Sequence, residues 1–357
     1  MNQPIVLVGA GRLGRKMLAA IITGHPTDTV SMFADRDPAK IGTTVDGVRV
    51  MALLSAVMHY PDALYVVTIW GAQNNHRIAD TERELRGLGV QHIESFGSVL
   101  RRYAPTESHY FIGPADFTQD NPMAGGIEWA DAQSLDVYRA NLQARLTGTV
   151  SDLPEPVSGP TYFPTDLFRY RDDEVIVDGG AYDGDTLRAF LATKRPFRQW
   201  YAFEPQPESA SRFTEHLAHI PEAQRSRVTL AHAALGASDG MAYFDPISSV
   251  DAAIVPAHVP GVSIPVLAYD CIGFSQAPTV VKLDIEGSEL DAIQGMRETI
   301  RRHRPVCAIC VYHRPDDLWK IPAALHALMP DARFYLRPHL SEGWETVCYA
   351  VPPERAL

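Results

Sequence analysis

The segment 175–186, with the sequence V-I-V-D-G-G-A-Y-D-G-D-T, restricts the fold of this chain more than any other stretch. Its first three residues are β-branched, which is typical of a buried parallel strand. The glycine pair that follows allows a sharp turn, and Gly184 allows the backbone to pass close to a ligand or a helix. Asp185 or Thr186 can cap the next helix. We therefore expect a strand–turn–helix unit that surrounds a polar ligand with backbone N–H groups.

Two acidic residues lie at the ends of the first two expected strands. Asp178 ends the first strand, and Glu204 ends the strand predicted over Gln199–Phe203, 26 positions after Asp178. This spacing is close to that of an acidic residue that binds a ribose at the end of a second strand. Two carboxylates would repel a pyrophosphate, but they suit a positively charged nucleoside. The pattern favours S-adenosylmethionine as the cofactor.

Further motifs follow in order: F-E-P-Q-P at 203–207, V-K-L-D-I-E-G-S-E-L at 281–290, Y-H-R-P-D-D-L-W at 312–319, and Y-L-R-P-H with W-E-T-V-C-Y-A-V-P between 335 and 352. Together with the first segment they resemble the FkbM-type family of S-adenosylmethionine-dependent methyltransferases, from about Tyr162 to Pro352. The resemblance implies an α/β fold of the class I methyltransferase type. Its sheet is mostly parallel and ends in an antiparallel C-terminal hairpin, predicted here from Arg333–Arg337 and Glu345–Val351.

The cofactor is expected to lie at the glycine turn and the neighbouring strand ends. Asp178 is expected to bond the methionine ammonium or the turn itself, and the resemblance implies that Glu204 binds both ribose hydroxyls. The expected cofactor-binding residues are Asp178, Gly179, Gly180, Ala181, Tyr182, Asp183, Gly184, Asp185, Thr186, Glu204, Pro205, Ala233, Ala234 and Asp284. Asp183, Asp185 and Thr186 have helix capping as an alternative role.

The candidate catalytic residues are Asp284, Glu286 and His313. Asp284 and Glu286 follow the strand predicted at 279–284, and His313 follows the next one, so all three should lie at the carboxyl edge of the sheet. We favour His313 as a general base with Asp284 positioning the acceptor. In the alternative, the three residues hold a divalent metal such as Mg²⁺ or Mn²⁺ that acidifies the acceptor hydroxyl. The dependence on a metal stays open.

Several aromatic and basic side chains are candidates for the acceptor pocket: Tyr162, Phe163, Trp319, Arg337, His339 and Trp344. Aromatic faces and a guanidinium suit a carbohydrate, although core packing is the better explanation for each tryptophan taken singly. These residues do not identify the acceptor.

A second glycine-rich turn lies at the N-terminus. A strand predicted at residues 4–8 leads into G-A-G-R-L-G at 9–14, and a further strand ends at Asp35. Gly9, Gly11, Gly14 and Asp35 match the pattern of a dinucleotide site, and the carboxylate favours NAD over NADP. The same turn also suits a nucleotide-sugar, or helix–strand packing alone. We therefore expect a smaller Rossmann-like domain here.

The predicted organisation is a Rossmann-like domain over residues 1–100, a linker and helical cap over 101–165, and the methyltransferase domain over 166–357. The amphipathic pattern of Asp131–Leu146 predicts a helix in the cap. Cys307 and Cys310 form C-x-x-C within an expected buried strand, where residues three apart point to opposite faces and cannot share a metal.

The formal charge of −11 argues against nucleic acid as a partner. No signal peptide or membrane span is recognisable, which predicts a cytoplasmic protein. A homo-oligomeric state remains open.

The sequence thus predicts an O-methyltransferase that transfers a methyl group from S-adenosylmethionine to a hydroxyl of a small molecule, a sugar or glycan, or a secondary metabolite. One alternative is an NAD-dependent oxidoreductase or epimerase that uses G-A-G-R-L-G. The other is a non-catalytic protein that binds a nucleotide-sugar.

Overall fold

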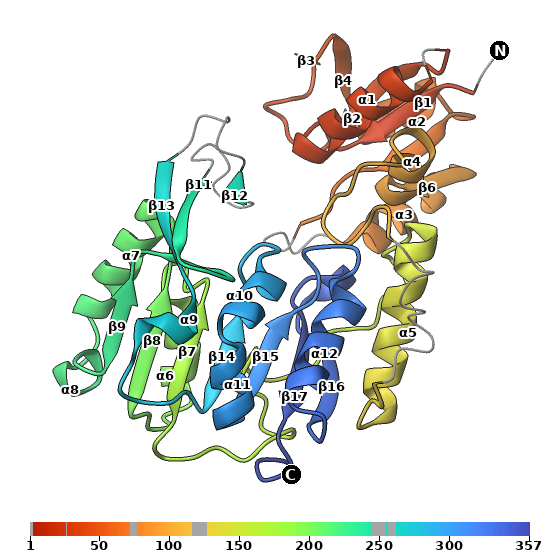
Figure 1. Ribbon diagram of the computed structural model, residues 1–357. Coiled ribbons are helices and arrows are strands. Elements are labelled where there is room, and N and C mark those ends of the chain that lie inside the picture. Colours follow the sequence, from red (N-terminus) through yellow and green to blue (C-terminus); the bar gives the residue numbers. More distant parts are fainter. Residues whose placement is uncertain (1–2, 26, 72–76, 116–126, 245–253, 256–261) are drawn as a thin grey trace.

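The computed structural model describes residues 3–25, 27–71, 77–115, 127–244, 254–255 and 262–357. They form three sheets (Figure 1). No helix in these ranges is long and apolar enough to cross a membrane.

The N-terminal sheet has six strands in the order β3-β4-β2-β1-β5-β6, parallel except for the short edge strand β3. Its strands are β1 Ile5–Val8, β2 Val30–Asp35, β3 Thr44–Val45, β4 Val48–Ala52, β5 Leu64–Val67 and β6 His92–Ser95. The helices that connect them are α1 Arg12–Gly24, α2 Leu53–His59, α3 Ile78–Gly87 and α4 Phe96–Tyr103. The α/β rhythm predicted for this part is present, but α4 extends three residues into the stretch expected to be linker.

The C-terminal sheet has seven strands in the order β16-β17-β15-β14-β7-β8-β9. The strands are β7 Val175–Gly179, β8 Gln199–Phe203, β9 Val228–Ala231, β14 Val280–Leu283, β15 Val306–Cys310, β16 Arg333–Pro338 and β17 Thr346–Val351. Five are parallel, while β17 pairs antiparallel with both β15 and β16. This is the parallel sheet with an antiparallel C-terminal hairpin that the sequence predicted. Cys307 and Cys310 lie on the buried strand β15, as expected.

Helices accompany this sheet: α6 Asp185–Ala192, α7 Pro207–Ala218, α8 Glu222–Arg225, α9 Tyr269–Ile272, α10 Glu289–Gly295, α11 Arg297–His303 and α12 Asp317–Leu328, with the short turn η1 Ser341–Gly343. A third sheet, seen above β8 and β9 in Figure 1, contains β10 Ala234–Leu235, β11 Gly240–Phe244, β12 Ile254–Val255 and β13 Val262–Leu267. Within the described residues, β11 pairs antiparallel with β13.

Helix α5, Ala132–Thr147, packs against the edge strand β16. Asp131 caps its first turn by accepting the Ser134 N–H at 2.8 Å, and Gly148 ends it in the left-handed conformation. Arg145 is fully buried and donates to the Pro315 and Val311 carbonyl oxygens at 2.8 and 2.9 Å. The amphipathic helix predicted here therefore joins the C-terminal sheet.

An aromatic contact joins the N-terminal sheet to the C-terminal one. Trp70, three residues beyond β5, stacks on Phe96 with ring centroids 4.9 Å apart and lies 4.4 Å from the ring of Trp344, which immediately follows η1. The Trp70 indole N–H also donates to the Glu342 carbonyl oxygen at 3.3 Å. As a result, the N-terminal sheet lies over the carboxyl edge of the C-terminal sheet, beside α5 (Figure 1).

Candidate active site

The glycine turn after β7 has the shape predicted from the sequence. Gly180 has a φ of +74°, and a Cβ at this position would lie 1.8 Å from the Asp284 carbonyl oxygen, so no other residue fits. Gly184 has a φ of +86° and is the N-cap of α6. The turn therefore holds the end of β7 tightly against the end of β14.

Glu204 holds the other side of this turn. Its two carboxylate oxygens accept the Tyr182 N–H at 2.8 Å and the Gln206 N–H at 2.7 Å. Only 6% of the residue is exposed, and burial raises its pKa although both N–H groups oppose that change. Each oxygen keeps a lone pair, so the carboxylate can still accept hydroxyl groups.

Asp178 does not reach the cavity, so of its two predicted roles, binding the methionine ammonium and supporting the turn, its position fits the second. Its carboxylate is fully buried, lies 3.0 Å from the Lys282 ammonium and accepts the Trp200 indole N–H at 3.2 Å. Lys282 also donates to the Gly179 and Gly180 carbonyl oxygens at 3.1 and 2.6 Å. Burial lowers the pKa of Lys282, but the charge of Asp178 outweighs it and keeps the amine protonated. Asp178 thus stabilises the turn indirectly, by holding the Lys282 ammonium that donates to the turn carbonyl groups.

A cavity of about 930 Å³ lies above the carboxyl edge of the C-terminal sheet. Of the predicted cofactor-binding residues, the structure brings nine to its wall: Gly180, Tyr182, Asp185, Thr186, Glu204, Pro205, Ala233, Ala234 and Asp284. Asp178, Gly179, Ala181, Asp183 and Gly184 are not part of this wall. Asp183 instead pairs with Arg188 at 2.9 Å.

Backbone strain gathers at this cavity. Five non-glycine residues of its wall have a positive φ between 45° and 66°: Tyr110, Tyr162, Tyr182, Glu286 and Glu345. Each such residue costs about 1–3 kcal/mol, and such conformations are concentrated at functional sites. The cavity is therefore the best candidate for the active site.

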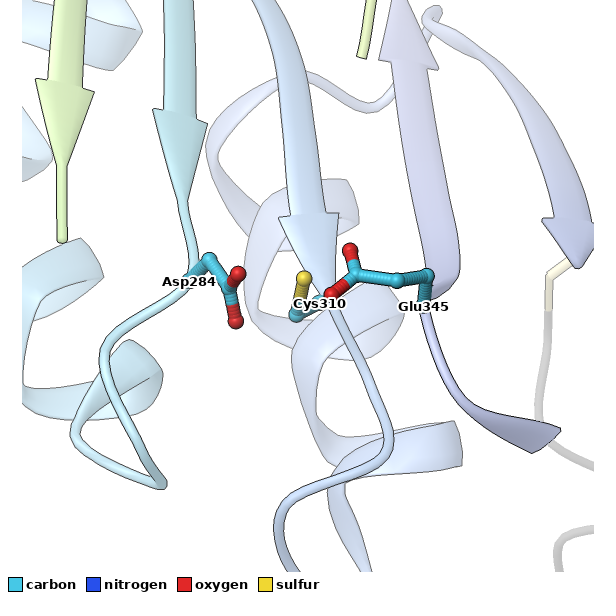
Figure 2. Close-up of side chains that lie close together, drawn as sticks. All are labelled: Asp284, Cys310 and Glu345. Carbon is cyan, nitrogen blue, oxygen red and sulfur yellow. The ribbon is translucent and has the colours of Figure 1, made fainter. Parts of the chain in front are cut away.

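Two carboxylates face each other across the ends of β14 and β17. Figure 2 shows Asp284 and Glu345 pointing toward one another on either side of Cys310. The Tyr162 hydroxyl lies 2.9 Å from an Asp284 oxygen and 2.5 Å from a Glu345 oxygen, and the Tyr312 hydroxyl bridges the same pair at 3.1 and 3.2 Å. We call these four residues the acidic network.

The acidic network requires a shared proton. Each tyrosine hydroxyl has one proton but contacts one oxygen of each carboxylate, so one carboxylate must itself donate. Burial and the nearby charge of Asp284 raise the pKa of Glu345 to about 7. The pKa of Asp284 is lowered: burial opposes ionisation, but His313 and Lys282 favour it more strongly. Below about pH 7 the proton of the network therefore lies on Glu345, while Asp284 is ionised.

His313 is enclosed by carboxylates. Its Nε2 lies 3.3 Å from Asp284 and 3.7 Å from Glu286, while its Nδ1 lies 2.9 Å from Glu289, which is fully buried. Burial lowers the pKa of the imidazole, but Glu289, Asp284 and Glu286 together raise it well above its usual value. The ring is an imidazolium, a poor candidate for the general base that the sequence favoured. It lines a smaller neighbouring pocket of about 330 Å³ with Glu286.

The ligand sets considered for a metal do not fit one well. An imidazolium with carboxylates on both nitrogens has no lone pair to offer, so the set Asp284, Glu286 and His313 is incomplete. Single ligand atoms of Asp284, Cys310 and Glu345 come within 4.8 Å of one another (Figure 2). However, the tyrosine hydroxyls already occupy those carboxylate oxygens, and burial raises the pKa of the Cys310 thiol well above normal.

Of the six residues predicted for the acceptor pocket, Tyr162 and Trp344 line the cavity. Phe163 packs on Phe190 and Trp200, and Trp319 lies in the core beneath the sheet. Arg337 pairs with Asp131 at the start of α5, and His339 contacts the Tyr349 hydroxyl at 2.7 Å. These four positions do not form part of the cavity wall.

Glu345 and Tyr312 are the site residues that sequence reasoning missed. Tyr312 directly precedes His313 within Y-H-R-P, and Glu345 directly follows Trp344 in W-E-T-V. Both positions lie inside motifs of the family resemblance. The available signal was a polar side chain next to the end of a strand whose other residues are buried.

The N-terminal glycine turn faces the same cavity. Gly9, Gly11 and Asp35 line it, whereas Gly14 lies against the Gly9 carbonyl oxygen, where a Cβ would come within 2.0 Å. Asp35 accepts the Ala10 N–H at 2.8 Å, much as Glu204 accepts the Tyr182 N–H. Gly14 therefore serves helix–strand packing, while Gly9, Gly11 and Asp35 are open to a ligand.

The sheet order and its antiparallel hairpin define a class I methyltransferase fold, with the candidate site at the carboxyl edge expected for α/β proteins. Residues 178–337 match the family model of the methyltransferase FkbM domain, and the chain therefore carries an FkbM methyltransferase domain. The comparison with curated proteins found no match.

Solved structures show how far the fold extends. A methyltransferase FkbM from Methylobacillus flagellatus KT is similar over 98% of this chain and 90% of its own, with a TM-score of 0.76 and 24% identity. The likeness therefore includes the N-terminal sheet. Two more distant structures carry no argument about function. One is a putative rRNA methylase from Clostridium thermocellum, with a TM-score of 0.33 and 13% identity over 52% of this chain and 89% of its own. The other is the Rex-family repressor RSP, with a TM-score of 0.23 and 16% identity over 26% of this chain and 44% of its own.

Proposed function

We propose that this protein is an S-adenosylmethionine-dependent O-methyltransferase that acts on a hydroxyl of a sugar, a glycan or a secondary metabolite. The observation that carries this proposal is the cavity itself, whose wall contains both the Glu204-capped glycine turn and the acidic network. A cofactor-binding turn and a proton acceptor thus line the same cavity of a methyltransferase domain.

The residues present fit the cofactor. Glu204 would hold the ribose hydroxyls with its remaining lone pairs, and Ala233 and Ala234 leave room for the base beside it. The backbone of the turn at Gly180 and Tyr182 would contact the amino acid part. When bound, S-adenosylmethionine supplies an electrophilic methyl group on a positively charged sulfur.

Asp284 is the proposed proton acceptor. An alcohol oxygen becomes strongly acidic as its new bond to carbon forms, so an ionised carboxylate suffices at that moment and no strong base is required. His313 keeps Asp284 ionised, and the Tyr162 and Tyr312 hydroxyls fix its orientation. In this proposal His313 is a positioning residue.

The test is transfer of a labelled methyl group from S-adenosylmethionine into glycan or metabolite extracts, with and without a chelator. We expect label in an alkali-stable ether and no effect of the chelator. Asp284→Asn should abolish transfer, whereas Asp291→Asn, a matched change on the exposed face of α10, should not. Transfer by Asp284→Asn at the wild-type rate would refute the assignment.

A further inference from the structure

The cavity extends from the C-terminal sheet to the N-terminal sheet. Ligand pockets for drug-sized molecules span roughly 300–1,000 Å³, and this cavity of about 930 Å³ lies near the upper end of that range. Its wall runs from Glu204 and Gly180 on the C-terminal sheet to Gly9, Gly11 and Asp35 on the N-terminal sheet. The carboxyl ends of both sheets thus line one cavity.

Gly11 has no structural reason to be glycine. Gly9 needs its positive φ of +110°, and Gly14 is packed against the backbone of Gly9. Gly11 instead has an ordinary extended conformation, with φ of −92° and ψ of −165°, and a Cβ there would meet nothing within 4 Å. As the N-cap of α1 it leaves the first N–H groups of a 13-residue helix without a capping side chain.

Basic side chains lie at this end of the cavity in a protein whose net charge is −11, and one of them, Lys40, lies 3.3 Å from Asp35. Arg12 and Lys40 line the cavity, and Lys16 lines the adjoining small pocket. Burial lowers the pKa of His109 to about 3, with further contributions from Lys16 and Arg12. The first turn of α1 contains no acidic residue. A helix N-terminus beside such side chains favours a phosphate group.

The remaining groups suit the rest of a nucleotide substrate. Asp35 lies at the end of β2 and is 8% exposed. Burial opposes its ionisation, but the N–H groups of Asp37 and Ala10 and the Lys40 ammonium lower its pKa. A carboxylate in this place can bind a ribose diol. Midway along the cavity, Trp344 is buried and its indole N–H has no acceptor among the described residues.

We propose that the acceptor is a nucleoside-diphosphate-linked substrate, whose nucleotide binds at Gly9, Gly11 and Asp35 and whose linked group reaches the acidic network. The diphosphate would contact the N-terminus of α1 with Arg12 and Lys40, and Asp35 would bind the nucleoside ribose. This inference rests on the proposed function, because it assigns the acceptor of the same methyl-transfer site.

Isothermal titration calorimetry with UDP, GDP, ADP and NAD, on the full chain with and without saturating S-adenosylhomocysteine, tests the inference. We expect a nucleoside diphosphate to bind the protein already loaded with S-adenosylhomocysteine. Displacement of S-adenosylhomocysteine would overturn the inference, because both molecules would then occupy the Glu204 end. Preferential binding of NAD would overturn it in favour of a dinucleotide cofactor.

Gly11→Asp is the decisive variant. Aspartate is a favourable N-cap, so the fold should be retained, while its carboxylate should weaken nucleoside diphosphate binding by about tenfold or more. Gly87→Asp adds the same charge to the N-terminal sheet at the end of α3, where a Cβ also meets nothing within 4 Å, and serves as the control. Equal effects of the two variants would contradict the site.

The two proposals fail separately. If S-adenosylhomocysteine binds but none of the nucleoside diphosphates does, the inference is overturned and the proposed methyltransferase function stands. If the nucleoside diphosphates bind and S-adenosylhomocysteine does not, the proposed function fails and the inference about its acceptor fails with it.

Discussion

Replacing Glu204 by glutamine should weaken the binding of S-adenosylhomocysteine by about a hundredfold. In the structure both carboxylate oxygens already accept a backbone N–H, at 2.7 and 2.8 Å, so each has capacity left for one ribose hydroxyl. A glutamine has a single acceptor oxygen, and its NH₂ group would face one of these N–H donors. Glu204→Gln thus loses at least one charge-assisted bond to the ligand and weakens the other.

The magnitude follows from the strength of such bonds. A hydrogen bond to a charged group contributes about 1.5–3 kcal/mol. The loss of one bond and part of another therefore amounts to about 3 kcal/mol, which is about two orders of magnitude in Kd. Because Glu204 also holds the glycine turn, the unliganded variant should be less stable, and thermal unfolding must be recorded beside the titration.

Calorimetric titration with S-adenosylhomocysteine measures the change directly. Glu208→Gln removes a carboxylate from the exposed first turn of α7, four residues away, and is the matched control. We expect its affinity to remain within about twofold of the wild type. If folded Glu204→Gln binds as tightly as this control, Glu204 does not contact the ligand and the placement of the cofactor is refuted.

Three further predictions concern the architecture around the site. Lys282→Met should lower the free energy of unfolding by about 3–5 kcal/mol in urea titrations, because Asp178 would remain buried and charged, and Asp178→Asn in the same chain should restore part of the loss. Trp70→Ala should cost about 3 kcal/mol by the same assay, since Trp70 fills the contact between the sheets; an unchanged midpoint would contradict that contact. The third concerns pH: the raised pKa of Glu345 means that its contribution to stability is fully present below its unfolded pKa and is lost as the pH rises from about 4.5 to about 7. Glu345→Gln should flatten this part of the stability profile, and a profile of unchanged slope would show that the proton resides elsewhere.

Local sequence patterns predicted those parts of the site that depend on one strand and its turn. Glu204 follows from F-E-P at a strand end, and the φ of Gly180 follows from the glycine pair. Asp178 acts on the turn through Lys282, which lies directly opposite it in the β7–β14 register, and no local pattern reveals this pairing. The position of a strand end was predictable, whereas its pairing partner was not.

Contacts between distant segments could not be predicted. Glu345 reaches Asp284 only because β17 returns antiparallel beside β15. His313 was predicted at the correct strand end. Its charge, however, depends on Glu289, which begins α10 after the turn that follows β14. The division into domains at about 100 and 165 stays a prediction. Part of the predicted linker, residues 116–126, lies outside the described residues.

The adjacent residues Trp344 and Glu345 link the contact between the two sheets to the acidic network. The indole ring holds the N-terminal sheet through Trp70, while the next side chain carries the proton of the acidic network. Any movement that separates the sheets would pull on the residue beside that proton. A ligand bound beside Gly9, Gly11 and Asp35 would thus affect the position of Glu345 in the acidic network. Separating the two sheets would remove one wall of the cavity and also release the Glu345 carboxyl group.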